Sequence, residues 1–87
     1  MFEKPVFDDV FVLESVRKVG QAHLKLSVRD GEQQYDAIWF FCPESWFAVR
    51  AKQVRLIYAL SINDFNGQRS VQFIVQHAQV VEALAVD

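Results

Sequence analysis

The sequence has few of the residues that characterise disulfide-rich or membrane-spanning chains. Cys42 is the one cysteine among 87 residues, so a disulfide framework and a cysteine-based zinc site are excluded, and a reducing compartment is favoured. We expect Cys42 to be a small buried apolar residue. No apolar run approaches the roughly 20 residues of a membrane-spanning helix, and none at the N-terminus has signal-peptide length. These absences predict a cytoplasmic protein.

A strong net charge is also lacking, because the formal charge is −2 and provides no overall basic field to attract nucleic acid. The cations are nevertheless clustered, and any such binding must come from their local arrangement. A first stretch, residues 17–29, contains no acid, and a second stretch, residues 50–69, is interrupted by a single one, Asp64. The cations of the two stretches are Arg17, Lys18, Lys25 and Arg29, and Arg50, Lys52, Arg55 and Arg69.

Large apolar side chains are abundant. The chain is 52% hydrophobic and has eight Phe, two Trp and two Tyr, which are the residues that bury the most apolar area. A chain of this length forms one small domain, which buries only about 60% of the surface of its unfolded state and so needs an efficient core. We therefore expect a single domain over residues 1–87.

Alternation and turn residues predict five strands. Residues 10–19 are rich in β-branched and aromatic side chains, and residues 23–29 alternate strictly between apolar and polar. Asp30-Gly31 predicts a hairpin turn, and a third strand is expected from Gln34 to Phe41. A short helix is expected within residues 43–51, followed by strands over residues 54–62 and 69–77 that Asn66-Gly67 joins as a hairpin. Residues 80–87 are too mixed to assign.

This order of elements predicts an all-β fold, a five-stranded OB-fold Greek-key barrel with a short helix between strands 3 and 4. An SH3-like barrel is the alternative, although it usually has no helix at that position.

The sequence resembles the C-terminal OB domain of RecJ-type single-strand-specific DNA exonucleases. The matching segments are residues 19–20 with 23–26, residues 35–38 and residues 58–72, and residues 3–7 resemble the junction that precedes this domain. The resemblance covers nearly the whole chain, although Trp39 and the segment 41–52 depart from the family pattern. It suggests an excised or truncated C-terminal domain.

The resemblance implies a parent enzyme of the DHH phosphoesterase superfamily. Such an enzyme degrades single-stranded DNA from 5′ to 3′ with manganese or magnesium, and acts in DNA repair and recombination. The metal-binding Asp and His motifs of its catalytic domains have no counterpart in this chain. We therefore expect no catalytic residue, no metal and no cofactor in this domain, and no activity of its own.

The leading hypothesis is a non-catalytic domain that binds single-stranded DNA. Strands two and three and the adjoining loops form the usual ligand face of an OB-fold, and cations there would contact phosphates while rings stack on bases. Trp39 and Tyr35 are the candidate rings, with packing in the core as the alternative. Arg69 is a candidate beside the Asn66-Gly67 turn, with an exposed ion pair to Asp64 as the alternative. The candidate nucleic-acid-binding residues are Arg17, Lys18, Lys25, Arg29, Tyr35, Trp39, Arg55 and Arg69.

A second hypothesis is a protein-interaction domain. The mild acidity of the chain and the aromatic side chains of residues 40–47 favour it. Its partner would be the catalytic core of the parent exonuclease or single-strand DNA-binding protein.

Overall fold

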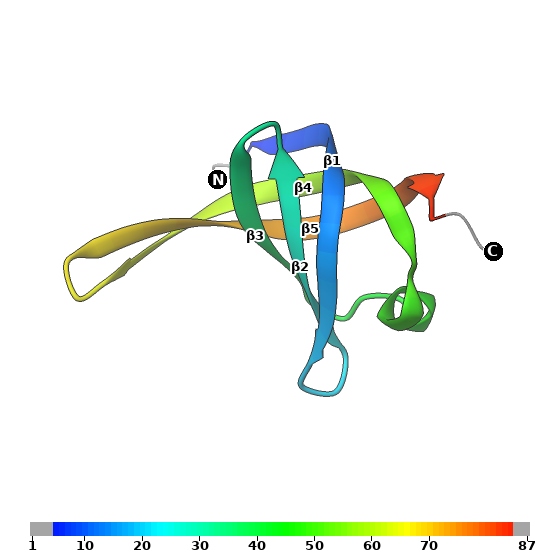
Figure 1. The fold of residues 1–87 in the computed structure, drawn as a ribbon. Coiled ribbons are helices and arrows are strands. Elements are labelled where there is room, and N and C mark those ends of the chain that lie inside the picture. The colour runs from blue at the N-terminus through cyan, green and yellow to red at the C-terminus, as the bar shows by residue number, and fades with distance from the viewer. Residues whose placement is uncertain (1–4, 85–87) are drawn as a thin grey trace.

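The computed structural model describes residues 5–84, which form five strands and one short helix (Figure 1). No helix in this range has the length and hydropathy to cross a membrane. The strands are antiparallel neighbours except for β3 and β5, which run parallel, and they close into a barrel in the order β1-β2-β3-β5-β4. The elements are β1 (Val6–Val19), β2 (His23–Asp30), β3 (Gln33–Trp39), the 3₁₀ helix η1 (Glu44–Ala48), β4 (Ala51–Phe65) and β5 (Gln68–Ala83).

Alternation along β2 determines which side chains fill the barrel. Leu24, Leu26 and Val28 are fully buried, whereas Lys25 and the other residues between them face outward. The inner row of β3 lies opposite these three residues in register, with Trp39 beside Leu24 and Tyr35 beside Val28. Because side chains in paired positions share a face, the rings of β3 point into the barrel.

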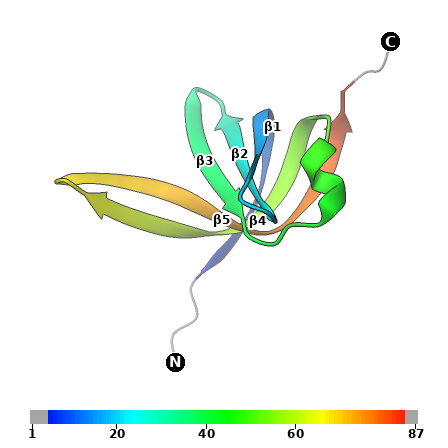
Figure 2. The same cartoon turned by 90° about the horizontal axis from the view of Figure 1, so that it is seen from below.

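The hairpin of β4 and β5 extends beyond the barrel as a two-stranded ribbon, which Figures 1 and 2 show projecting away from β3. Its turn residues Asn66 and Gly67 both have positive φ, 53° and 76°, as the turn predicted from Asn-Gly requires. In the hairpin of β2 and β3 the turn residues are Gly31 and Glu32, one position later than predicted, and Gly31 carries the positive φ of 62°.

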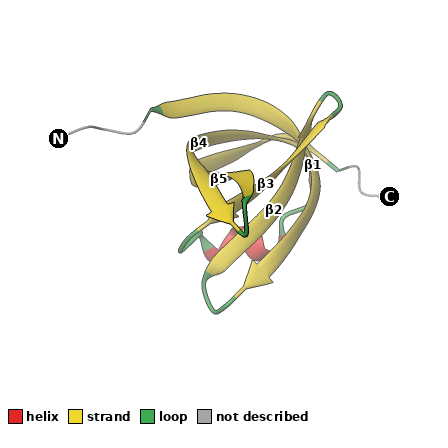
Figure 3. Ribbon diagram, turned by 90° about the vertical axis from the view of Figure 1, so that its left-hand side faces the viewer, coloured by secondary structure: helices red, strands yellow, loops and turns green. Residues whose placement is uncertain are grey.

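Several boundaries differ from the sequence expectation. β1 begins at Val6 because its first residues pair with the middle of β4, and β5 continues to Ala83, which pairs with Ala51. The helix is one short 3₁₀ segment, in which the backbone N–H of Trp46 donates to the carbonyl of Pro43 at 3.0 Å. Figure 3 shows this helix, in red, behind the strands in the lower half of the view. The described residues do not include 1–4 and 85–87. Part of the resembled junction and part of the unassigned C-terminal segment therefore lie outside the described residues.

Candidate nucleic-acid interface

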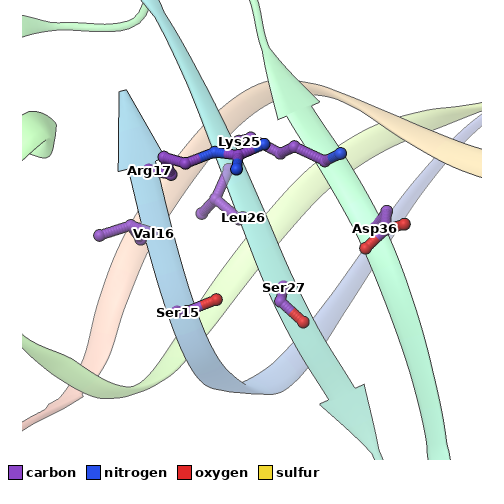
Figure 4. Close-up of a pocket in the computed structure, with 7 residues that line it drawn as sticks. All are labelled: Ser15, Val16, Arg17, Lys25, Leu26, Ser27 and Asp36. Carbon is purple, nitrogen blue, oxygen red and sulfur yellow. The ribbon is translucent and has the colours of Figure 1, made fainter. Parts of the chain in front are cut away.

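Two cations lie side by side on the outer face of β1 and β2. The three-residue connection after Val19 sets the register of the hairpin so that Arg17 lies opposite Lys25 and Ser15 opposite Ser27. These four residues, with Asp36 of β3, line a shallow hollow of about 390 Å³ (Figure 4), which we call the cationic hollow. Cations spaced along a strand are suited to contacting successive phosphates.

The two cations of this hollow form no ion pair within residues 5–84. Neither Arg17 nor Lys25 lies within ion-pair distance of an Asp or Glu of these described residues. Asp36 lines the hollow on the neighbouring strand, opposite Ser27, and forms no ion pair with described residues. The positive charge of Arg17 and Lys25 therefore remains available to an anion from solvent.

Exposed rings follow on the same side of the barrel. His23 lies two residues before Lys25 and shares its outward face. The ring of His23 lies edge-on to those of Phe40 and Phe41, with centroid distances of 5.2 and 4.8 Å. The exposed fractions of Phe40 and Phe41 are 49% and 78%. The rings of Phe40 and Phe41 are accessible and contact His23, which precedes Lys25 on the outward face of β2. Such rings are suited to stacking on unpaired bases.

The exposed position of Phe41 depends on an unusual backbone conformation. Its φ is 53°, which is a strained value for a bulky residue and is often found at functional positions. Its backbone N–H donates to Nδ1 of His23 at 3.1 Å, and the next N–H, of Cys42, donates to the carbonyl of Ala22 at 3.1 Å. These two hydrogen bonds join the end of β3 to the loop between β1 and β2 and keep the turn in place.

The comparisons with known proteins agree with this architecture. The family model of the RecJ OB domain matches residues 1–77. The chain belongs to the RecJ OB domain family. The chain is 39% identical over 80 residues to the single-stranded-DNA-specific exonuclease RecJ of Escherichia coli (strain K12). The aligned segment covers 88% of this chain and 14% of that protein. It is 40% identical over 78 residues to the RecJ exonuclease of Salmonella typhimurium, covering 86% and 14%. The chain thus spans about one seventh of these relatives.

Two solved structures share the fold. RecJ of Thermus thermophilus in complex with Mg²⁺ superposes with a TM-score of 0.67 at 18% identity, over 92% of this chain and 12% of that one. The mitochondrial single-stranded DNA binding protein Rim1 of S. cerevisiae superposes with a TM-score of 0.72 at 14% identity, over 93% and 99%. Together with the closed barrel, these likenesses confirm the predicted OB-fold.

The two candidate rings of the sequence analysis lie inside this RecJ OB domain. The exposed fraction of Trp39 is 6%, and its ring packs edge-on against Trp46 at 5.3 Å. Tyr35 is half-buried and stacks on Phe73 at 4.8 Å. The burial of Trp39 therefore favours the alternative of core packing over stacking on a base. The reason is that both residues lie opposite the apolar row of β2, so they share its inward face.

Most other predicted cations have partners elsewhere. Arg29 pairs with Glu14 at 3.2 Å, Arg69 pairs with Asp64 at 3.0 Å on the ribbon, and Arg55 pairs with Asp8 through its Nε and Nη2 atoms. The ammonium group of Lys18 lies 4.8 Å from the centre of the Phe47 ring, because Lys18 faces the opposite side from Arg17. Three of these four cations are thus engaged in ion pairs, and the pair of Arg69 with Asp64 is the one given as the alternative to DNA contact.

The alternation of residues 23–29 already places His23 on the same outward face as Lys25. Sequence reasoning missed Phe40 and Phe41 as parts of a nucleic-acid surface, because it assigned them to the aromatic segment 40–47 that favours a protein partner. The alternation of β3 places Phe40 on the outward face with Asp36, which was an available signal. No local signal marks Phe41, because a positive φ at phenylalanine depends on hydrogen bonds to residues about 18 positions away.

Proposed function

We propose that this RecJ OB domain binds single-stranded DNA on the outer face of β1 and β2. The sugar-phosphate backbone would cross the cationic hollow and contact Arg17 and Lys25, while bases stack on Phe40 and Phe41. The observation that supports this most is the pair of adjacent cations without a carboxylate partner in residues 5–84. Arg29, Arg55 and Arg69 would have to leave their own ion pairs to take part, and we give them a secondary role.

The domain would serve a longer RecJ-type exonuclease by holding the strand that is being degraded. The relatives are named as single-stranded-DNA-specific exonucleases, and the domain spans one seventh of their length. Hydrolysis would take place in the rest of such a protein, where Mg²⁺ or Mn²⁺ would act, and would contribute to repair and recombination. Within residues 5–84, no group of three or more His, Cys, Asp or Glu side chains is arranged to hold a metal ion.

Titration of a labelled oligonucleotide against the 87-residue chain at several salt concentrations tests the proposal. The double variant Arg17→Ala/Lys25→Ala should lose at least about tenfold in affinity at low salt. The slope of log K against log salt concentration should also become smaller in magnitude by about 1.4, because each lost phosphate contact removes about 0.7. The matched control Arg50→Ala/Lys52→Ala removes the same charge from exposed positions outside the cationic hollow. Equal weakening in both variants would contradict a specific cationic site.

A second candidate function is docking on a protein, because Phe40 and Phe41 form an exposed aromatic pair. The partner would be the catalytic core of the exonuclease or single-strand DNA-binding protein. NMR titrations separate the two functions: oligonucleotide should shift the amides of Arg17 and Lys25, whereas a protein partner alone should shift those of residues 40–47.

A further inference from the structure

A second hollow, of about 290 Å³, lies at the end of the barrel where β1 begins and β2 ends, and where β4 and β5 leave as the ribbon (Figures 1 and 2). Its walls include Phe7, Tyr58, Leu60 and Val71, and two carboxylates, Asp9 and Asp30, also line it. We call it the aromatic hollow. None of its lining residues contributes to the cationic hollow, so the two are separate surfaces.

Stacked rings form the inner part of this hollow. Tyr58 stacks on Phe73 with centroids 4.2 Å apart, and Phe7 stacks on Tyr58 at 5.7 Å. Toward the solvent the lining is apolar but accessible, with exposed fractions of 38% for Phe7, 41% for Leu60 and 45% for Val71. Apolar side chains that line an open hollow in this way leave a surface whose burial would stabilise a complex.

The charge of the hollow indicates what would cover it. Within residues 5–84, Asp8, Glu14, Asp64 and Glu82 each form an ion pair, whereas Asp9 and Asp30 form none. Asp9 accepts a hydrogen bond from the Tyr58 hydroxyl at 2.7 Å, which holds one carboxylate at the inner wall. A nucleic-acid strand is disfavoured here, because two carboxylates would face its phosphates. A cation with an apolar stem is favoured.

We propose that the aromatic hollow binds an arginine side chain, flanked by apolar residues, on a partner protein. The guanidinium group is planar, stacks on aromatic faces and donates up to five hydrogen bonds, so it can contact the rings and the carboxylates together. Its methylene stem would cover Leu60 and Val71 while neighbouring apolar residues cover Phe7. This binding does not depend on the DNA-binding proposal.

An NMR titration of the 87-residue chain with the acetylated peptide amide leucine-arginine-leucine tests the proposal. The amides of Asp9, Asp30, Leu60 and Val71 should shift and saturate. A peptide with norleucine in place of arginine should bind about tenfold more weakly, the loss expected for one charge-assisted hydrogen bond. Equal binding of the two peptides, or no shift with either, would overturn the proposal.

Variants show whether the carboxylates are responsible. Asp9→Asn/Asp30→Asn should reduce arginine-peptide binding about tenfold while retaining an acceptor for the Tyr58 hydroxyl, so that folding is preserved. Asp64→Asn removes a carboxylate from the ribbon of β4 and β5, outside the hollow, and should leave binding unchanged. If oligonucleotide shifts the same amides, the hollow binds DNA instead. If these amides shift with the concentration of the chain itself, without peptide, the hollow binds a second copy of the chain.

Discussion

The cationic hollow and the aromatic hollow have opposite chemistry. In the cationic hollow, Arg17 and Lys25 lie with Ser15, Ser27 and Asp36, and neither cation is within ion-pair distance of a carboxylate in residues 5–84. In the aromatic hollow, Asp9 and Asp30 lie among stacked rings with no cation from the same described range to pair with them. Outside the two hollows, four ion pairs are formed within residues 5–84, Arg29 with Glu14, Lys52 with Glu82, Arg55 with Asp8 and Arg69 with Asp64. Each hollow thus contains unpaired charge mainly of one sign, while Lys18, Glu32, Glu44 and Arg50 also form no ion pair within residues 5–84.

This separation explains how a chain with a net charge of −2 can present a phosphate-binding surface. Exposed charges more than about 8 Å apart are largely screened at physiological salt, so a strand on one face responds mainly to the cations beneath it. Net charge is therefore a poor guide to the binding properties of this domain. The predictions below test whether the two regions are as independent in function as they are in charge.

The largest effect is expected where the two regions share a core. Phe73 contacts Tyr58, Tyr35 and Phe11, with centroids 4.2, 4.8 and 5.6 Å away. Phe73→Ala should lower the free energy of unfolding by about 3–5 kcal/mol, measured by urea denaturation, and should disrupt both hollows together. Val71→Ala, at an exposed neighbouring position, should cost less than about 1 kcal/mol. Similar costs for the two variants would mean that Phe73 is not central to the packing.

A smaller effect is expected at Phe41, where binding and stability should separate. Phe41→Gly and Phe41→Ala should both weaken oligonucleotide binding by about 1–3 kcal/mol, the range for loss of one stacked base. Because only glycine is unstrained at a φ of 53°, the Gly variant should be about 1 kcal/mol more stable than the Ala variant. Binding comes from titration and stability from thermal unfolding. Unchanged binding in both variants would exclude Phe41 from the interface.

The barrel was predictable from the sequence where its signals are local. Strict alternation at Leu24, Leu26 and Val28 identifies the interior of β2, and Asn66-Gly67 identifies the β4–β5 turn. The ends of the strands were not predictable, because they are determined by distant pairing. Val6 is in a strand because it pairs with Ala59, more than 50 residues later, and no local pattern records that contact.

The site was predictable only in part, for a related reason. The first basic stretch indicated the face on which Arg17 and Lys25 lie, but their adjacency depends on the register set by a three-residue loop. The pairing of Arg55 with Asp8 joins residues 47 positions apart and is invisible in a linear reading of charge. The inward direction of Trp39 follows from its register against Leu24, which requires knowing how the strands pair.

An effect of about 0.5–1.5 kcal/mol is expected from the Tyr58 hydroxyl in the aromatic hollow. Burial and the hydrogen bond to Asp9 raise the pKa of Tyr58, so the folded state favours the neutral phenol. Its contribution to stability is complete below the unfolded pKa of about 10 and is lost as the pH rises beyond it. Unfolding measured between pH 8 and 11 should show a smaller alkaline loss in Tyr58→Phe, and an identical loss would contradict this account.

The smallest effect is expected from the exposed pair of Arg55 and Asp8, which lies outside both hollows. The guanidinium group holds the pKa of Asp8 below its ordinary value, so the stabilisation is present above about pH 4 and is lost as the pH falls through the lowered pKa. Arg55→Ala should slightly reduce stability at neutral pH, because exposed ion pairs contribute little, and should not reduce it in strong acid. The same variant should leave oligonucleotide affinity nearly unchanged. Thermal unfolding under the two conditions measures the first effect. A large loss of affinity would instead show that Arg55 leaves Asp8 to contact DNA, and that the DNA-binding surface extends from the cationic hollow to β4.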